Sequence, residues 1–215
     1  MTKQNIGIVY GGKSAEHSIS LLTAKSIINA IDKEKYNVFP IFISLEGNWA
    51  KGEQIKSEIK DQNELRFTNF NSDISSLLFE DGRKFDLVFP VLHGPNGEDG
   101  TIQGFLEIMD IAYVGNNVLS SAAGMDKVVM KQLFAAYDLP QLPYTHFIEY
   151  TWKKNKEAVV KEVNDNLKYP VFVKPANLGS SVGISRCNDE AELVKGIEEA
   201  LKFDKRIVIE QGAVG

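Results

Sequence analysis

The opening of the chain has the pattern of a strand, a tight turn and a helix. Residues 6–10 form a compact apolar run that ends in the pair Gly11-Gly12, and apolar residues then recur every three to four positions from about Ser14 onward. A second apolar run, residues 38–44, has the length of another strand. Strand–helix–strand order implies a parallel sheet whose ligand crevice lies at the carboxyl ends of its strands. The first part of the chain is therefore predicted to be an α/β domain.

Local details of this first part carry predictions of their own. Ser14 is expected to cap the first helix, because a serine oxygen accepts hydrogen bonds from the free amides at a helix start. Pro40 removes one ladder donor from the second strand, which favours an edge position in the sheet. His17 is interpreted as a structural or solvated histidine. Residues 45–84 are polar and broken by glycines, with weak helical signals near residues 74–79, and we assign no site there.

Residues 86–92 have the pattern of a buried strand and run into residues 93–101, a loop with three glycines, one proline and two acids. This composition is typical of a shaped turn, so Glu98 and Asp99 are interpreted as turn and helix-start residues rather than as a metal pair. His93 on its own is most simply a structural histidine. Its place directly after a buried strand, in a glycine-rich turn, favours a role in a substrate subsite.

The second part of the chain is predicted to be an α+β domain. Its expected elements are a helix after residues 125–127, a strand at 144–149, a charged helix at 152–167, a strand at 171–173 with a hairpin return to residue 187, a helix from residue 189 and a strand at 206–210. The predicted domains are residues 1–115, with a Rossmann-like parallel sheet, and residues 116–215.

Residues 174–183 of the second domain combine a lysine at a strand end with a small polar loop that glycines bracket. Pro175 ends the strand, and Gly179 and Gly183 permit positive φ angles or a close approach of the backbone. Backbone amides and serine hydroxyls of such a loop can surround an anion that Lys174 neutralises. A hairpin turn with a solvated lysine fits the local pattern equally well, so both interpretations stay open at this level.

Composition excludes several classes of protein. The chain has 215 residues, a net charge of −5 and a pI near 5.3. Its lysines are interleaved with acids rather than forming a basic stripe, which argues against nucleic-acid binding. The single cysteine, Cys187, excludes an internal disulfide framework and fits a reducing compartment. No apolar stretch reaches the length of a membrane span, about 18 residues, so we expect a cytoplasmic protein without membrane contact.

Five separated motifs give the chain a resemblance to a known family. They are residues 11–17, 93–101, Met125-Asp126-Lys127, residues 174–183 and Glu210. In this order and at these separations they resemble the N-terminal portion of D-alanine:D-alanine ligases, bacterial cell-wall enzymes of the ATP-grasp superfamily, and the finer detail is similar to staphylococcal members. The resemblance covers the whole chain and implies a pre-ATP-grasp domain followed by the central, α+β ATP-grasp subdomain.

The resemblance implies a two-step ligation with ATP and Mg²⁺ or Mn²⁺ as cofactors. ATP phosphorylates the carboxylate of one D-alanine, and the amine of a second D-alanine attacks the acyl phosphate to give D-alanyl-D-alanine for peptidoglycan synthesis and cell shape. Positioning and charge neutralisation dominate phosphoryl transfer, so lysines on the triphosphate and a glycine loop over it meet the need. Family members are commonly dimers, so a homodimer is expected.

For the D-alanine subsite, the resemblance implies Glu16, His93 and Ser180. The matching glutamate of the family holds the ammonium group of the first D-alanine in a hydrogen-bonded set with a serine, which aligns with Ser180, and with a tyrosine beyond residue 215. The matching histidine lies near the same substrate. Without the resemblance, a glutamate close to a helix start has a simpler explanation, an interaction with the helix dipole worth about 0.3–1 kcal/mol.

For the nucleotide, the resemblance implies a set of six residues from three motifs: Lys127, Lys174, Ser181, Glu210, Gln211 and Ala213. The two lysines match the family's nucleotide lysines. Glu210 matches the residue that holds the adenine amino group, and the backbone of its neighbours faces the ring edge. The simpler alternatives are solvated lysines and a charged residue that merely ends a strand.

The resemblance also implies parts that this chain lacks. Family members continue into a C-terminal ATP-grasp subdomain with the magnesium ligands, so we expect no metal ligand in this chain and no turnover by the chain alone. Two alternatives remain: a remnant that binds nucleotide weakly at most, and an ATP-grasp ligase with another second substrate such as D-lactate. A Rossmann dinucleotide enzyme is discounted, because the G-x-G-x-x-G spacing is absent.

Overall fold

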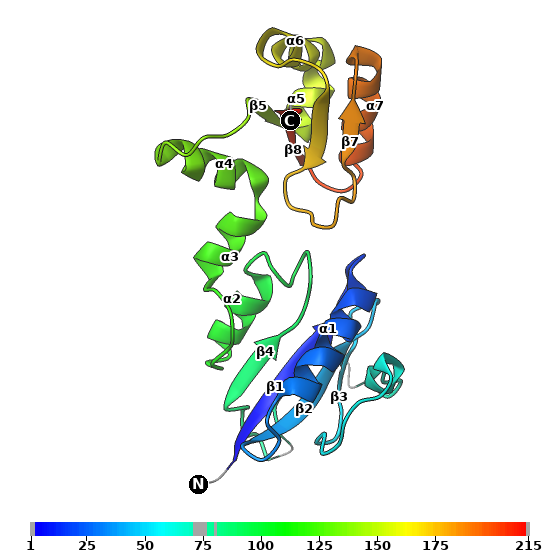
Figure 1. Cartoon of the computed structure of the whole chain (residues 1–215), viewed down its shortest axis with the longest axis vertical. Helices are drawn as coiled ribbons and strands as arrows, with labels where there is room; N and C mark the ends of the chain where they lie inside the picture. Colours follow the sequence, from blue (N-terminus) through cyan, green and yellow to red (C-terminus); the bar gives the residue numbers. More distant parts are fainter. Residues whose placement is uncertain (1–2, 71–76, 80, 214–215) are drawn as a thin grey trace. The chain divides into compact units, whose positions relative to one another are not determined.

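The computed structural model describes residues 3–70, 77–79 and 81–213. The chain divides into two compact units, Met1–Ala122 and Ala123–Gly215, each with a four-stranded sheet and its own core (Figure 1). Within the described residues, none of the helices combines the length and the apolar character that crossing a membrane requires.

The first unit is built on a sheet with the strand order β3-β2-β1-β4. β1 (Gln4–Gly11) pairs in parallel with both β2 (Tyr36–Ile43) and β4 (Leu87–Pro90), whereas β3 (Trp49–Lys51) runs antiparallel to β2. The parallel strands confirm the predicted α/β organisation, and β3 adds an antiparallel edge that the sequence pattern does not indicate.

Helices cover both faces of this sheet. In β1, Ile8 belongs to the core under α1 (His17–Ala30) and Val9 to the core under α2 (Thr101–Ile108), as the alternation of side chains along a strand requires. A short 3-10 helix, η1 (Gln62–Leu65), adds Leu65 to the α1 side. The unit therefore has three layers, helix, sheet and helix.

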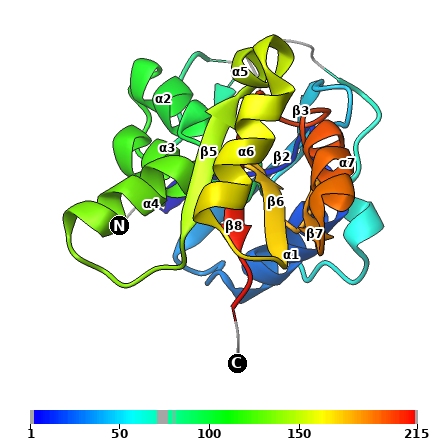
Figure 2. The same ribbon diagram turned by 90° about the horizontal axis from the view of Figure 1, so that it is seen from above.

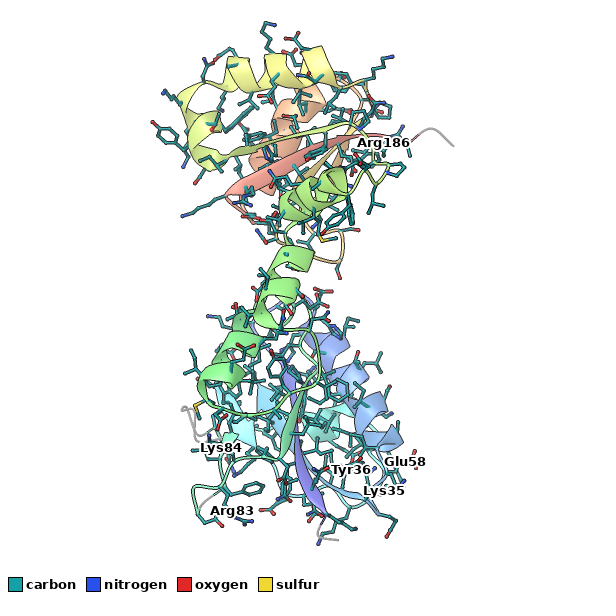
Figure 3. All side chains as sticks on the ribbon, turned by 90° about the vertical axis from the view of Figure 1, so that its left-hand side faces the viewer. Lys35, Tyr36, Glu58, Arg83, Lys84 and Arg186 are labelled. Carbon is teal, nitrogen blue, oxygen red and sulfur yellow. The ribbon has the colours of Figure 1, made fainter. Side chains whose placement is uncertain are left out.

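The three parallel strands end at one edge of the sheet. Lys35 and Tyr36 at the start of β2, and Lys84 before β4, lie at the opposite, amino-terminal edge (Figure 3). The loops that follow β1 and β4, which carry the glycine motifs, therefore share the carboxyl-terminal edge, where the ligands of α/β sheets bind.

The structure corrects two details of the first unit. Helix α1 starts with Glu16 rather than Ser14 as its N-cap residue, and Ser14 Oγ instead accepts a hydrogen bond from the Glu16 amide at 3.0 Å.

Pro40 lies in β2, an interior strand rather than the predicted edge strand. The Pro40 carbonyl points to the β3 side of β2, where it accepts a hydrogen bond from the Gly52 amide at 2.9 Å, just beyond the end of the β2–β3 ladder. An amide hydrogen on residue 40 would point to the same side as this carbonyl. Because β3 does not reach that position, the sheet loses no ladder hydrogen bond at Pro40. The helical signals near residues 74–79 lie largely outside the described residues.

The second unit is built on an antiparallel sheet with the order β5-β8-β6-β7, in which the last strand of the chain lies in the interior. The strands are β5 (Tyr144–Ile148), β6 (Val171–Pro175), β7 (Ser185–Cys187) and β8 (Arg206–Gln211). The helices are α4 (Lys127–Ala136), α5 (Glu149–Lys154), α6 (Lys156–Asn166) and α7 (Glu190–Ala200), and α3 (Val118–Met125) precedes them.

Helices α6 and α7 pack along one face of this sheet and bury its main core (Figure 2). The helix predicted over residues 152–167 is wrong as a single element, because the chain forms α5 and α6 with a break at Asn155. Asn155 ends the first helix and caps the second, since its side-chain oxygen accepts a hydrogen bond from the Ala158 amide at 3.0 Å.

Candidate functional site

The turn after β1 depends on its two glycines. Gly11 and Gly12 both have φ angles of 91°, a region that side chains disfavour. A Cβ on Gly11 would also lie 2.2 Å from the Ile43 carbonyl oxygen. His17, which is buried, donates through Nδ1 to the Gly12 carbonyl at 2.9 Å, so of the two roles considered for it, structural or solvated, the structure shows the structural one. The glycine pair therefore lets the chain turn directly from β1 toward α1.

Glu16, at the start of α1, lies against the loop that follows β4. Gly94 has a φ angle of 72°, and a Cβ at this position would lie 2.5 Å from Glu16 Oε2 and 3.1 Å from Ser14 Oγ. The glutamate carboxylate therefore sits against the backbone of the residue that follows His93. Two motifs that are far apart in the sequence come together here, at the carboxyl-terminal edge of the first sheet.

The His93 side chain is held between two polar neighbours. Its Nε2 lies 3.1 Å from Thr23 Oγ1, and its Nδ1 lies 3.8 Å from Glu98 Oε1. The Thr23 hydroxyl donates to the Ile19 carbonyl at 2.9 Å, so it offers His93 an acceptor, which favours the tautomer with hydrogen on Nε2. His93 thus has an oriented ring at the sheet edge, and its side chain is 27% exposed.

Glu98 and Asp99 have the turn and helix-start roles that the sequence predicts. Glu98 Oε2 accepts a hydrogen bond from the Gly94 amide at 3.0 Å. The two carboxylate oxygens of Asp99 accept from the amides of Asn96 and Thr101 at 2.9 and 3.0 Å. Thr101 is the first residue of α2, so Asp99 fixes both the turn and the entry of the chain into this helix.

A cavity of about 700 Å³ opens at the same edge of the first unit. Its walls include Trp49 and Phe105, whose ring centroids lie 6.1 Å apart, together with the glycine pair after β1 and His93. A cavity of about 300–1,000 Å³ is the usual size of a small-molecule site. The carboxyl-terminal edge of the first sheet can therefore accommodate a ligand beside His93.

In the second unit, strand alternation places the predicted nucleotide residues on one face of the sheet. Ile207 and Ile209 of β8 pack into the core under α6 and α7, whereas Val208 points to the opposite face. Glu210 shares the face of Val208, because successive side chains alternate along a strand. Lys174 of β6 pairs in register with Val208, so it lies on this face too. The carboxylate and the lysine therefore face the same space.

Glu210 binds two lysines, and we call Lys131, Lys174 and Glu210 the charge cluster. Glu210 Oε2 lies 2.6 Å from Lys174 Nζ, and Oε1 forms a short ion pair with Lys131 Nζ of α4. Burial by itself would raise the pKa of Glu210, but the hydrogen bonds and charges of the two lysines outweigh it and hold the pKa below its ordinary value. The carboxylate is therefore kept ionised.

Lys127, at the start of α4, holds the base of the glycine loop. Its Nζ donates to the Leu178 carbonyl at 2.6 Å, and its amide donates to the Ala176 carbonyl at 3.1 Å. Burial, followed by the nearby positive charge of Lys174, lowers the pKa of Lys127. Lys127 and the charge cluster bring three ammonium groups and one carboxylate into one region. Asp126 and Asp204 also act on Lys127, and Arg206 binds Asp126, so a small excess of positive charge is left, which suits a polyphosphate.

Asp126 links the start of α4 to β8 and to the loop. Its Oδ1 accepts from the amides of Val128 and Val129 at 2.8 and 3.1 Å, which caps the helix. Its Oδ2 accepts from Arg206 Nη1 at 2.6 Å and lies 3.4 Å from Asn177 Nδ2. Asp126 therefore sets the position of the helix that carries Lys127 and Lys131.

The stretch from Lys174 to Gly183 combines features of both sequence interpretations. It connects the antiparallel strands β6 and β7, so it is a hairpin connection. Its lysine is not simply solvated, because it binds Glu210. Ser180, Ser181 and Gly183 have φ angles of 51°, 60° and 69°, and left-handed serines are uncommon and carry strain. Hairpin turns with positive φ usually have glycine or asparagine at such positions, so two serines there are unusual.

Other predicted residues have different surroundings. The side-chain oxygen of Gln211 accepts a hydrogen bond from the Lys168 amide at 3.0 Å, and the backbone amide of Gln211 donates to the Pro143 carbonyl at 2.9 Å. Ala213 is exposed and follows β8. Glu16 belongs to the first unit and Ser180 to the second, so their predicted pairing stays a prediction.

Sequence reasoning missed Lys131. The signal available was its spacing of four from Lys127, which places both on one side of a helix, but a lone helix lysine is ordinarily solvated. Asp126 and Arg206 were also missed as partners, because they are far apart in the sequence. Within the part of the chain that the structure describes, no three His, Cys, Asp or Glu side chains gather in a group that could hold a metal ion.

Comparisons with known proteins match both units. The family model described as "D-ala D-ala ligase N-terminus" matches residues 5–116, and that described as "D-ala D-ala ligase C-terminus" matches residues 133–215. The fold is similar to the D-alanine-D-alanine ligase from Coxiella burnetii, with 30% identity and a TM-score of 0.79 over 100% of this chain and 63% of that one.

Two further solved structures are similar over the whole chain. The VanG D-Ala:D-Ser ligase from Enterococcus faecalis has 33% identity and a TM-score of 0.83, with 64% of its length covered. The D-alanyl-alanine synthetase A from Vibrio cholerae has 29% identity and a TM-score of 0.78, with 60% covered. The chain thus spans less than two thirds of these proteins. Since the N-terminal model alone matches more than half of the 215 residues, the chain belongs to the D-alanine–D-alanine ligase family.

Proposed function

We propose that this chain carries the first-substrate and nucleotide sites of an ATP-dependent ligase that joins two D-alanines in cytoplasmic peptidoglycan synthesis. The observation that carries the proposal is the grouping of Lys127 with the charge cluster at the base of the glycine loop. Phosphoryl transfer needs positioned positive charge more than covalent chemistry from the protein. Membership of the ligase family supports the same assignment.

In the second unit, Lys127 and Lys174 bind the phosphates, and Ser181 with the loop backbone closes over them. Glu210 accepts a hydrogen bond from the 6-amino group of adenine, and the backbone near Gln211 and Ala213 faces the ring edge. The fixed, ionised carboxylate of Glu210 supports this role, because an ionised carboxylate can only accept hydrogen bonds. When bound, ATP supplies the phosphoryl group that activates the substrate carboxylate.

In the first unit, Glu16 holds the ammonium group of the first D-alanine and His93 lines the same subsite. The contact between Glu16 and Gly94 supports this assignment, since it places the carboxylate beside the loop that carries His93. Binding the amine of a small amino acid also fixes the direction of its carboxylate. This positioning lowers the entropic part of the reaction barrier. Ser180, a residue of the second unit, is assigned to the first D-alanine by the family resemblance alone. We assign no magnesium or manganese ligand to the described residues.

The second substrate of the ligation has two alternatives to D-alanine. The Enterococcus faecalis structure at 33% identity is titled a D-Ala:D-Ser ligase, so family members with similar sequences to this chain differ in the second amino acid. D-serine and D-lactate are therefore the alternatives to a second D-alanine. A non-catalytic nucleotide-binding module is the alternative for the 215-residue chain on its own.

The test is ATP turnover with defined substrates. ADP and phosphate release is measured for the chain itself, and for the protein with any further residues that its gene encodes downstream, with D-alanine, D-serine or D-lactate. Mass spectrometry then identifies the products. The proposal predicts D-alanine-dependent release and D-alanyl-D-alanine in the longer protein, both lost in Glu16→Gln. Release that does not depend on D-alanine, or that Glu16→Gln leaves unchanged, would contradict the proposed substrate site.

A further inference from the structure

The charge cluster differs from the other lysine ion pairs of the described residues. Its side chains are 12% exposed at Lys131, 16% at Glu210 and 24% at Lys174. The other lysine–carboxylate pairs have lysines that are 43–74% exposed. Exposed pairs add little to stability, whereas burying charges is costly unless the geometry is good. A buried carboxylate that takes two lysines therefore needs an explanation beyond the usual surface pair.

Lys131 is fixed more firmly than an ion pair requires. Its Nζ lies 4.9 Å from the ring centroid of Tyr144, which adds a cation–π contact. Its carbonyl accepts a hydrogen bond from Gln141 Nε2 at 2.8 Å, which ties the middle of α4 to the segment before β5. Tyr144 pairs in register with Glu210 across β5 and β8. The lysine, the ring and the carboxylate thus form one row on the same face of the sheet.

Each of the two lysines binds a different oxygen of the Glu210 carboxylate. Lys174 takes Oε2 and Lys131 takes Oε1, so rotation of the carboxylate would break both contacts. A carboxylate has about four acceptor positions, and two remain after the lysines are bound. Glu210 is therefore oriented, ionised and still able to accept a hydrogen bond from a ligand.

We propose that Lys131 is a positioning residue of the nucleotide site: it holds the Glu210 carboxylate as a fixed acceptor for the 6-amino group of adenine, and so selects 6-aminopurine over 6-oxopurine nucleotides. The inference rests on the proposed function, in which Glu210 faces the adenine ring. A 6-oxo group is an acceptor, and two acceptors repel each other. Without Lys131, the carboxylate loses one fixed oxygen and takes up a proton more readily, and a protonated carboxyl group can donate to a 6-oxo group.

The test compares ATP with inosine triphosphate, which carries an oxygen in place of the 6-amino group. Both nucleotides have the same triphosphate, so the ratio of their dissociation constants cancels the loss of a positive charge near the phosphates. We expect the wild-type chain to prefer ATP by about 10-fold to 100-fold, the range that one hydrogen bond to a charged group provides. In Lys131→Met this ratio falls about tenfold, and Lys131→Arg restores most of it.

Two further variants separate positioning from a general structural effect. Lys161→Met removes an exposed lysine of α6 and leaves the ratio unchanged. In Glu210→Gln the ratio falls close to one, and adding Lys131→Met to this variant changes it no further, because Lys131 acts through Glu210. Circular dichroism shows that each variant is folded.

The outcomes distinguish the inference from the function it rests on. If the wild type binds ATP but Lys131→Met keeps the wild-type ratio, the inference is wrong while the nucleotide site stands. An effect of Lys131→Met that persists in the Glu210→Gln background also overturns it. If the folded wild-type chain binds neither nucleotide, the proposed nucleotide site fails, and the role of Lys131 fails with it.

Discussion

Replacing Asp126 tests how the structure positions the lysines of α4. Asp126 caps this helix through two amide hydrogen bonds and binds Arg206 through its other oxygen. Asp126→Ala removes both functions, whereas Asp126→Asn keeps a capping oxygen and removes the charge. The two variants therefore separate the cap from the ion pair, and we expect Asp126→Ala to destabilise the second unit more.

The magnitude follows from the two contacts. Loss of an N-cap costs about 1 kcal/mol. The Asp126 side chain is 11% exposed but the Arg206 side chain is 42% exposed, so solvent screens the pair and its loss costs only about 1 kcal/mol. Asp126→Ala should thus lower the free energy of unfolding by about 2 kcal/mol and Asp126→Asn by about 1 kcal/mol.

Tryptophan fluorescence during urea unfolding measures these changes. The chain has two tryptophans, Trp49 in the first unit and Trp152, 2% exposed, in the second. In a Trp49→Phe background, Trp152 reports on the second unit alone, and a loss of about 2 kcal/mol should move the midpoint by about 1 M urea. In a Trp152→Phe background, the Trp49 transition should not move.

Two results would refute the reasoning. Equal losses in Asp126→Ala and Asp126→Asn would show that the cap contributes nothing. In the Arg206→Met background, Asp126→Asn should cost much less than in the wild type, since the ion pair is already absent. An undiminished cost there would show that the two side chains do not interact in solution.

Three further predictions concern single residues. Gly11→Ala should destabilise the first unit by clearly more than Gly82→Ala in the same urea assay with Trp49. Both glycines have positive φ, but only the Cβ at Gly11 would meet backbone, the Ile43 carbonyl oxygen at 2.2 Å; equal losses would contradict the contact. The pKa of Glu210 is lowered in the folded state, so the ionised carboxylate stabilises the fold above its unfolded pKa, about 4.3, and this stabilisation is lost as the pH falls through the folded value. The free energy of unfolding reported by Trp152 should therefore fall less with acid in Glu210→Gln than in the wild type. An equal dependence on pH in the two proteins would count against the charge cluster. Burial raises the pKa of Cys187 to about 11, so a thiol reagent at pH 8 should react with the folded chain at a small fraction of its rate in denaturant; similar rates would show that the thiol is accessible.

The parallel strands and the first helix of the first unit could be predicted from the sequence because their signals are local, whereas β3 and η1 were not predicted. The apolar run before Gly11 and the three-to-four spacing after it determine a strand, a turn and a helix without reference to the rest of the chain. The acids at Glu98 and Asp99 likewise bind amides within five positions. The prediction of an edge strand from Pro40 was wrong, because the amide hydrogen that proline lacks would point toward β3, and β3 is too short to pair with residue 40.

The second unit was harder because its contacts are distant in sequence. The break at Asn155 is visible only as a capping residue within a helical pattern, and such residues also occur inside helices. The charge cluster joins α4, β6 and β8, and its pairs are separated by 79 and 36 positions. Alternation along β8 predicts which side chains share a face, but the position of α4 over that face comes from the tertiary packing. Lys131 therefore had no distinctive signal.

The most direct test of the account is nucleotide binding by the 215-residue chain, measured by isothermal titration with a non-hydrolysable ATP analogue and magnesium. The account predicts saturable binding of one nucleotide per chain. Lys174→Met should weaken it by at least about tenfold, the effect of losing one charged contact, whereas Lys161→Met, with its exposed lysine, should leave it unchanged. Absence of saturable binding by the folded wild type, or equal affinity in Lys174→Met, would contradict the assignment of this face of the second sheet as the nucleotide site.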